Sequence, residues 1–494
     1  MQHINKKLDE KKLITVVSLD IEGAFDSAWW PAIRVQLAKG KCPLNIRRVI
    51  DSYLDQRKVT VRYNGETFTK ATNKGCVQGS IGGPILWNVL LDPLLVALEA
   101  EKHYVQAFAD DVVMVFDGQT AQQVQRQANA ALELVRVWGV ENKLKFAPHK
   151  TNAMLITRKL KFDAPRLCMG GIDIGLSKQI KMLGVTFDEK LTFNAHVSNV
   201  CRKAINVYKQ LARAAKASWG LHPEVIRTIY TATIEPIILY AASVWAPAAE
   251  KLGVQKQLGA VQRGFAQKMC KAYRTVSLNS ALVLAGMLPL DLRVRENLTD
   301  ISRQNKAVTL FWIKAHAGLE GNERADKLAK EAASASKKRK PDYDAFPVSF
   351  AKRQLRLESI REWDVRYKSG EVAGITKIFF PDVTTAYKVI RKFEPTFLST
   401  QLFTGHGGFS EYLYRFKCKE NPSCICDSSI KETVPHIVLE CPVFGREKFK
   451  IEQILDIKIT IETIKFIMLD KGRKEFMNYC LKIIEKVVKR NKQK

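Results

Sequence analysis

The hydrophobic and polar positions in the N-terminal part of the chain predict short strands. Residues 13–19, LITVVSL, form a β-branched apolar run that is typical of a buried strand, and this run ends at Asp20. Residues 59–70 alternate between polar and apolar side chains around Asn64-Gly65, the dipeptide preferred in tight hairpin turns. We therefore expect a buried strand that ends in an acid, followed by a hairpin.

A second acidic position and several helices complete the pattern of this part. Residues 104–116, YVQAFADDVVMVF, predict two short strands joined at Ala109, Asp110 and Asp111. Helices are expected at residues 45–57, 85–101 and 121–140. This order of elements favours an α+β fold class up to residue 190, in which helices pack on one face of an antiparallel sheet.

The remaining chain is mainly helical in pattern. Residues 195–295 predict a separate helical lobe, and residues 453–490 have helical character within a lysine-rich C-terminal part. Between them, SASKKRKPDYD combines small residues, consecutive basic residues and a proline, as an exposed linker does. Its basic run, Lys337–Lys340, is either part of that solvated linker or a nuclear localisation signal.

The net charge indicates a partner. Lys and Arg together number 79 against 50 Asp and Glu, which gives a net charge of +29. Such an excess usually serves a polyanion, because each neutralised phosphate releases counterions. Nucleic acid is therefore the leading partner, and a basic protein that is merely soluble is the alternative that composition leaves open.

Cysteine usage and apolar segments indicate the compartment. The ten cysteines are spread unevenly, with four of them between Cys418 and Cys441, which favours a reducing compartment over a disulfide framework. The N-terminus, MQHINKKLDEKK, is charged where a signal peptide needs an apolar core. Residues 230–249 are membrane-like but contain Glu235 and two prolines, so we interpret them as a buried helix and its flank. We expect neither secretion nor a membrane partner.

The acids at the strand ends suit phosphoryl transfer. When a hydroxyl attacks a phosphate in line, negative charge builds on the attacking and leaving oxygens, and paired divalent ions stabilise both. Mg²⁺ prefers hard oxygen ligands, so a few carboxylates at neighbouring strand ends are a sufficient protein contribution. Asp20, Asp110 and Asp111 have that arrangement if the acid pair sits at a hairpin bend. We expect two Mg²⁺ ions there, with Asp110 the firmer ligand.

Three segments resemble one family. SLDIEGAFDSAWW, KGCVQGSIGGPILWNVLLDPLL and YVQAFADDVVMVF are similar, in this order, to motifs A, B and C of LINE-like, arthropod-type non-LTR retrotransposon reverse transcriptases. The resemblance implies a palm fold, an RNA template, a DNA primer or target, deoxynucleotides as substrates, and Asp20, Asp110 and Asp111 as catalytic metal ligands. A viral RNA-dependent polymerase or an intron maturase is a further reading, which the downstream segments disfavour.

The same resemblance implies roles for several other residues. Phe25 is similar to the aromatic gate that excludes a 2′-hydroxyl; from the residues alone it could equally be a core side chain at a helix start. Gln78 and Gly79 look like the motif B loop along template and incoming base, where glycine allows close backbone approach. Lys150 matches the motif D lysine that donates a proton to pyrophosphate, and residues 182–184 resemble the primer-grip turn.

A further segment, residues 311–333, resembles the C-terminal end of a type-1 ribonuclease H domain. The resemblance assigns product release to His316 and metal binding to Asp326. The other three carboxylates of such a domain should lie upstream, but the segment that resembles the end of the thumb stops near residue 297. We therefore expect His316 and Asp326 to be remnants and ribonuclease H activity to be absent.

A cysteine and histidine pattern near the C-terminus could bind zinc. Cys424, Cys426, His436 and Cys441 have the form C-x-C-x9-H-x4-C, with Cys418 as a possible substitute ligand. Four such ligands can close a tetrahedral zinc site, although a single residue between the first two cysteines is shorter than the usual gap. Buried structural cysteines are the alternative. The pattern resembles the zinc-knuckle-like motif of the same retrotransposons.

The combined prediction is a reverse transcriptase palm without its fingers, a helical thumb and a small, mainly helical C-terminal domain. The expected boundaries are palm 1–190, thumb or connection 191–298, ribonuclease H remnant 299–335, basic linker 336–350 and C-terminal domain 351–494. The expected function is RNA-directed DNA polymerase of an incomplete element copy, acting in the nucleus. The alternative is a non-catalytic nucleic-acid-binding remnant.

Overall fold

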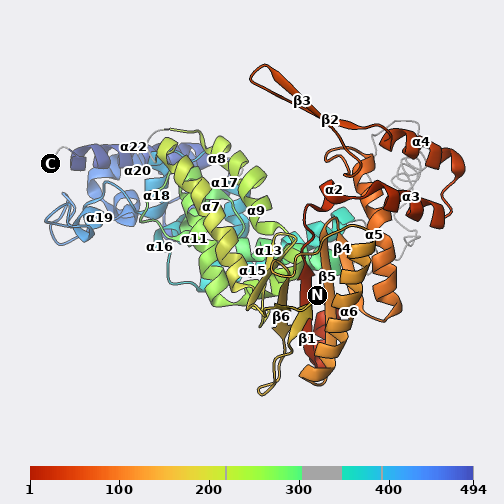
Figure 1. The fold of residues 1–494 in the computed structure, drawn as a ribbon. Coiled ribbons are helices and arrows are strands. Elements are labelled where there is room, and N and C mark those ends of the chain that lie inside the picture. Colours follow the sequence, from red (N-terminus) through yellow and green to blue (C-terminus); the bar gives the residue numbers. More distant parts are fainter. Residues whose placement is uncertain (217–219, 303–347, 391–392, 493–494) are drawn as a thin grey trace, which may run out of the picture. The chain divides into compact units, whose positions relative to one another are not determined.

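The chain divides into two compact units. The computed structural model describes residues 1–216, 220–302, 348–390 and 393–492 (Figure 1). The first unit is Met1–His196 and the second is Val197–Lys494. The domain boundaries expected from the sequence remain predictions.

The first unit is mixed α and β. Its elements are α1 (Gln2–Asp9), β1 (Leu13–Leu19), α2 (Ala24–Ser27), α3 (Trp30–Lys39), α4 (Leu44–Leu54), β2 (Lys58–Tyr63), β3 (Glu66–Ala71), α5 (Gly82–Ala100), β4 (Tyr104–Phe108), β5 (Asp111–Gly118), α6 (Ala121–Glu141), β6 (Asn152–Ile156), β7 (Leu167–Met169), β8 (Ile172–Ile174), β9 (Gln179–Met182) and β10 (Val185–Asp188). The strand at 13–19, the acidic hairpin and the expected helices are all present, so the α+β prediction is confirmed.

The central sheet is antiparallel and has the strand order β4-β5-β1-β6. β1 is an interior strand of this sheet, and both faces of β1 are buried. Helices α5 and α6 cover one side of the sheet, and α1 also contacts β1. Leu13, Val17 and Leu19 share one hydrophobic core with residues of α5 and α6. A continuous apolar run, rather than an alternating one, is therefore what β1 requires.

The hairpin β2–β3 stands apart from this core. Its strands pair around Asn64 and Gly65, whose φ angles of 49° and 83° are both in the left-handed region. The asparagine-glycine turn expected from the sequence is thus confirmed. Every residue of both strands is exposed, and Figure 1 shows the hairpin projecting away from the rest of its unit.

The second unit is helical in its described part. Its elements are α7 (Asn194–Ala214), which starts at the unit boundary, α8 (Pro223–Ile229), η1 (Tyr230–Ile234), α9 (Glu235–Leu239), α10 (Ala242–Trp245), η2 (Ala246–Glu250), α11 (Leu252–Met269), α12 (Leu278–Ala285), α13 (Leu290–Ser302), α15 (Val348–Ser369), α16 (Gly374–Phe379), α17 (Val383–Ile390), α18 (Phe397–Thr404), α19 (Ser410–Arg415), η3 (His436–Glu440), η4 (Pro442–Phe444), α20 (Gly445–Leu455), α21 (Ile461–Leu469) and α22 (Arg473–Lys492).

The apolar stretch 230–249, expected to be a buried helix and its flank, does not contain one continuous helix. It is broken into a π-type turn, two short helices and a 3₁₀ turn, with Ala241 at a φ of 50° between the short helices. Proline at the start of α9 and again in η2 accounts for breaks in the hydrogen-bond ladder. Burial was anticipated correctly, because Ile234, Ile238 and Trp245 are inaccessible to solvent.

Among the described helices, α5 is also long and apolar enough to cross a membrane, and the bent segment from α8 to η2 passes the same test as one broken span. The sequence reading singled out only the second. In α5 the side chains of Trp87, Leu90, Leu94 and Leu98 are fully buried in the core of the first unit. Such a core helix meets the length and composition criteria without spanning a bilayer.

Candidate functional site

The pairing register brings the three aspartates together. β1 and β5 pair Leu19 with Val112, so one further step sets Asp20 opposite Asp111. β4 and β5 pair Phe108 with Asp111, which leaves Asp110 in the hairpin turn. Directly opposed residues have Cβ atoms about 4.5–5.5 Å apart. The strand-end acids that the sequence singled out therefore meet at one edge of the sheet.

The acids repel one another. Partial burial raises the pKa of the Asp111 carboxyl, and the negative charges of Asp110 and Asp20 raise this pKa further. The side chains of Asp110 and Asp111 are nevertheless exposed, and Asp20 is half-buried. Hard oxygen ligands of like charge at an accessible edge fit divalent cations such as Mg²⁺, because a cation between them removes the repulsion.

Asp20 is held through its backbone by the segment before β6. The Asp20 amide donates to the Thr151 hydroxyl over 3.3 Å, and the Asp20 carbonyl accepts from the Ala147 amide over 2.9 Å. Lys150 lies between these two contacts in the chain, and its side chain is exposed. Its charge, together with Lys145, lowers the pKa of Glu22, for which the hydrogen bond from Lys145 is the largest cause. The predicted motif D lysine is thus the chain neighbour of a residue that contacts Asp20, and Thr151 is a positioning residue that sequence reasoning missed.

Trp87 connects the acidic turn to Phe25. Its indole N–H donates to the Ala109 carbonyl over 2.8 Å, and its ring stacks on Phe25 with centroids 5.2 Å apart. Ala109 has a φ of 54°, a left-handed conformation that non-glycine residues seldom adopt. The indole therefore anchors a strained turn and the proposed gate at once. The sequence could have indicated this contact, because a tryptophan within an apolar helix requires a hydrogen-bond partner for its N–H.

The glycine-containing loop before α5 runs along the segment that carries Phe25. The Cys76 amide donates to the Phe25 carbonyl over 2.7 Å, and the Gly75 amide donates to the Ala28 carbonyl over 2.8 Å. Gln78 and Gly79 follow as exposed residues, and Gly79 has a φ of 81° that favours glycine. The structure therefore brings the start of this loop next to Phe25, while its expected place along template and incoming base stays a prediction.

The four cysteine and histidine residues near the C-terminus converge. The ligand atoms of Cys424, Cys426, His436 and Cys441 all lie within 4.8 Å of one another. The Cys424 and Cys441 sulfurs are 3.7 Å apart, and the Cys426 sulfur is 3.1 Å from His436 Nε2. Cys418 is exposed and stands outside this cluster, so it is not the substitute ligand considered from the sequence.

The turns around the cluster explain how a short spacing can work. The Cys424 amide donates to the Ile430 carbonyl over 2.7 Å, which folds the intervening residues into a tight loop. His436 begins the π-type turn η3 and Cys441 directly follows it, and Glu440 Oε2 lies 3.5 Å from His436 Nδ1. A carboxylate on the far ring nitrogen orients a metal-binding histidine. Soft ligands in this arrangement fit a tetrahedral zinc ion.

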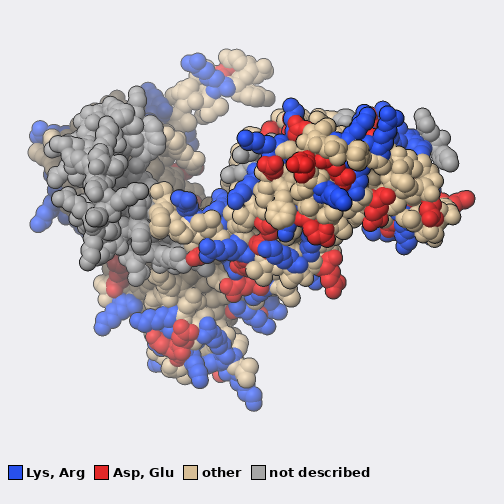
Figure 2. Space-filling model, turned by 180° about the vertical axis from the view of Figure 1, so that it is seen from behind, with Lys and Arg blue, Asp and Glu red and all other residues tan. Residues whose placement is uncertain are grey.

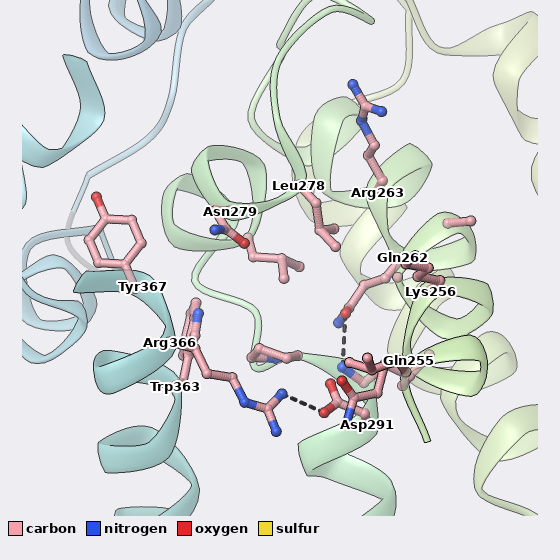
Figure 3. Close-up of a pocket in the computed structure, with 16 residues that line it drawn as sticks. Gln255, Lys256, Gln262, Arg263, Leu278, Asn279, Asp291, Trp363, Arg366 and Tyr367 are labelled. Carbon is pink, nitrogen blue, oxygen red and sulfur yellow. Dashed lines mark hydrogen bonds and ion pairs between the residues drawn. The ribbon is translucent and has the colours of Figure 1, made fainter. Parts of the chain in front are cut away.

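A cavity of about 440 Å³ in the second unit is lined neither by the three aspartates nor by the four cysteine and histidine residues. Figure 3 shows two pairings among its polar groups: Arg366 pairs with Asp291 at 2.6 Å, and Gln262 accepts from the Leu290 amide. Trp363 and Tyr367 are buried in its wall. The cavity reads as a gap between packed helices. His316, Asp326 and Lys337–Lys340 lie outside the described residues.

Comparison with known families agrees with the aspartate geometry. Residues 2–187 match the family described as reverse transcriptase (RNA-dependent DNA polymerase), and residues 290–334 match RNase H. The first match covers nearly all of the first unit, and the second is confined to a short segment.

Similar proteins include those of R1 non-LTR retrotransposons and of the mobile element jockey. The 115 kDa protein in type-1 retrotransposable element R1DM of Drosophila melanogaster is 29% identical over 86% of this chain, which spans 39% of that protein. The Pol polyprotein of element R1 2 of Nasonia vitripennis is 29% identical over 75% of this chain and 85% of its own length. The RNA-directed DNA polymerase from mobile element jockey of Drosophila melanogaster is 24% identical over 49% of this chain and 27% of its own.

Proposed function

We propose that this chain supplies the catalytic palm of an RNA-directed DNA polymerase of an R1-like non-LTR retrotransposon. Its template is RNA, its primer is the DNA target, and its substrates are deoxynucleotides. The observation that carries the proposal is the strand register that sets Asp20 opposite Asp111, beside the turn with Asp110. The family match and the R1 relatives support it.

Asp20, Asp110 and Asp111 would hold two Mg²⁺ ions, which stabilise the charge that develops on the attacking and leaving oxygens. The chain's own groups set the geometry around that chemistry. Phe25 occupies the space that a ribose 2′-hydroxyl needs. Lys150, whose side chain is exposed and whose chain neighbour Thr151 accepts a hydrogen bond from the Asp20 amide, would donate a proton to the leaving pyrophosphate. Trp87 and Thr151 hold the acidic turn and Asp20 in position.

Primer extension on an RNA template tests this proposal. Asp110→Ala should abolish incorporation, whereas Asp163→Ala should leave it unchanged, because Asp163 is an exposed carboxylate on a distant loop of the same unit. Salt-sensitive binding of RNA without any incorporation by the unsubstituted chain would instead support the non-catalytic remnant. Equal activity of the two variants would contradict the assignment of the aspartates.

Ribonuclease H activity should be absent. The match covers residues 290–334 only, and the sequence before it lacks the other acidic segments of such a domain. An RNA–DNA hybrid labelled on the RNA strand should remain intact with the chain and Mg²⁺. Metal-dependent cleavage that is lost in Asp326→Asn would contradict this prediction.

The Cys/His cluster, defined as Cys424, Cys426, His436 and Cys441, should bind one zinc ion. Convergence of the four ligand atoms supports this, and burial raises the pKa of the Cys426 and Cys441 thiols, so their thiolates need a nearby cation. Zinc measured after exhaustive dialysis should be one equivalent. If no zinc is found, the four residues are structural side chains only.

Nucleic acid binding and nuclear action complete the proposal. On the face shown in Figure 2, Lys and Arg side chains are interspersed with Asp and Glu. The net charge of +29 still attracts a polyanion from all sides. Copying at a chromosomal target requires entry to the nucleus, for which the run at 337–340 is the candidate signal.

A further inference from the structure

A second cavity of the second unit has the composition of a binding site. It has a volume of about 560 Å³, within the range of small-ligand sites, and it lies away from the Asp291–Arg366 pair described above. Residues far apart in the sequence line it, among them Thr275, His406, Glu411, Tyr412 and Arg415. None of these has a role in the proposed polymerase chemistry.

Its polar groups form a chain that ends in a free acceptor or donor. The Thr275 hydroxyl lies 2.9 Å from His406 Nδ1 and 2.7 Å from the Tyr412 hydroxyl. No described residue hydrogen-bonds His406 Nε2. Since both hydroxyls can rotate, the chain can run in either direction, and Nε2 can then either donate or accept. The cavity can therefore match more than one ligand edge.

The imidazole is neutral at physiological pH. Burial, followed by the positive charges of Arg415 and Arg263, lowers the pKa of His406 to about 4. A neutral ring presents a flat apolar face as well as one nitrogen. The His406 and Tyr412 rings lie with centroids 5.0 Å apart, and Phe416 continues this row at 4.7 Å from Tyr412. These rings are tilted by 46° and 42° to one another, and of the three only His406 and Tyr412 line the cavity, so a planar base can pack against these two.

The charges of the cavity are mixed. Arg415 is exposed at its edge, and Glu411 offers a carboxylate acceptor in the same wall. The carboxylate repels a free phosphate but suits the amino group of a base, as in contacts from Glu to cytosine N4. A ligand that combines a flat ring, an amino donor and a phosphate satisfies all of these groups together.

We infer that the cavity binds one unpaired nucleotide of a single-stranded nucleic acid, with its base against Tyr412 and His406 and its phosphate on Arg415. With this site, the second unit would bind an unpaired strand independently of the aspartates. It goes beyond the proposed polymerase activity, since it uses none of the groups around Asp20.

Fluorescence anisotropy of the full chain with a labelled 12-nucleotide single-stranded RNA tests the inference. Arg415→Gln should weaken binding at least about fivefold, and Arg446→Gln less than about twofold, although each removes one exposed positive charge. The same difference should appear with single-stranded DNA and disappear with a fully paired duplex. Equal losses in the two variants, or an equal difference with duplex, would overturn the site.

Two further arms separate stacking and free phosphate from the proposed ligand. Tyr412→Ala should weaken single-strand binding about tenfold; if this variant misfolds, Tyr412→Phe keeps the ring and should stay within about threefold of the unsubstituted chain. Cytidine monophosphate should compete with the RNA, and inorganic phosphate at equal ionic strength should not. Equal competition by phosphate would reduce the cavity to an anion site. The difference in RNA binding between the Arg415→Gln and Arg446→Gln variants should persist in an Asp110→Ala background. Failure of the cavity proposal can therefore be distinguished from failure of the polymerase proposal.

Discussion

The acidic turn and the Cys/His cluster are both candidate metal centres, and they are built in opposite ways. The aspartates are partly or fully exposed, repel one another and owe their position to backbone contacts from Thr151 and Trp87. The cysteines and histidine mostly lie buried, and their ligand atoms already converge within 4.8 Å. Among the described residues, only the cluster has ligand atoms gathered so tightly.

This difference corresponds to two uses of a metal. An exposed set of hard ligands leaves room for water, nucleotide and a metal that comes and goes with substrate. A closed set of soft ligands leaves no open position and contributes folding free energy instead. Substitutions in the acidic turn should therefore change rates, and substitutions in the cluster should change stability.

The largest effect should come from Cys424→Ser. Removing one ligand should release the zinc and destabilise the C-terminal part by more than about 4 kcal/mol, because zinc binding is coupled to folding. Thermal unfolding and zinc content measure both. Cys418→Ser is the matched control, since Cys418 is exposed and outside the cluster. An unchanged melting temperature for Cys424→Ser would remove the distinction between the two centres.

Phe25→Val should relax the choice of sugar. A smaller side chain leaves space for the 2′-hydroxyl, so the preference for deoxynucleotides over ribonucleotides should fall about 10- to 100-fold. The ratio of kcat/KM for the two substrates in primer extension measures it. Cys424→Ser protein that remains folded should keep the original ratio, and an unchanged ratio in Phe25→Val would make Phe25 a core side chain only.

Trp87→Phe should slow incorporation about tenfold without altering that preference. Phenylalanine keeps the stack on Phe25 but loses the N–H that holds the Ala109 carbonyl, at a cost of about 1–2 kcal/mol. Single-turnover rates report the slowing, and the substrate ratio is the internal control. If the rate is unchanged, the hydrogen bond does not position Asp110.

The smallest effect should appear in the metal-free chain. The raised pKa of Asp111 means that the folded state holds this proton more tightly than the unfolded state, so ionisation above the ordinary carboxyl pKa costs stability. Asp111→Asn should therefore stabilise the first unit at pH 7, by less than about 1 kcal/mol because solvent screens the exposed charges. Thermal unfolding with EDTA should show this gain, and the gain should vanish near pH 3. A loss of stability at pH 7 would mean that Asp111 has a favourable partner.

Much of the first unit could be predicted because its signals are local. The run at 13–19, the Asn64-Gly65 turn and the acidic hairpin each depend on neighbouring residues, and the structure contains all three. The positioning roles of Trp87 and Thr151 could not be predicted in this way, since each acts on a backbone atom distant in sequence.

The second unit was harder for the same reason. Residues 230–249 were predicted to be a buried helix and its flank because hydropathy reports burial, whereas the breaks depend on proline positions and on packing against α11 and α13. The spacing of the Cys/His cluster did not decide whether zinc binds. Two cysteines separated by one residue can both act as ligands only when the loop from Cys424 to Ile430 has closed. The cavity around His406 brings together residues from four separate segments and leaves no trace in the pattern.

The projecting hairpin has a consequence for anyone who handles the purified chain. Val61, Tyr63 and Phe68 are more than half exposed on one face, and both strand edges are open. Two strands without a third are marginally stable in water, and unpaired edges recruit strands from other molecules. Concentrated samples should consequently aggregate or be cleaved by trace proteases at residues 58–71. The substitution Val61→Lys should slow this aggregation.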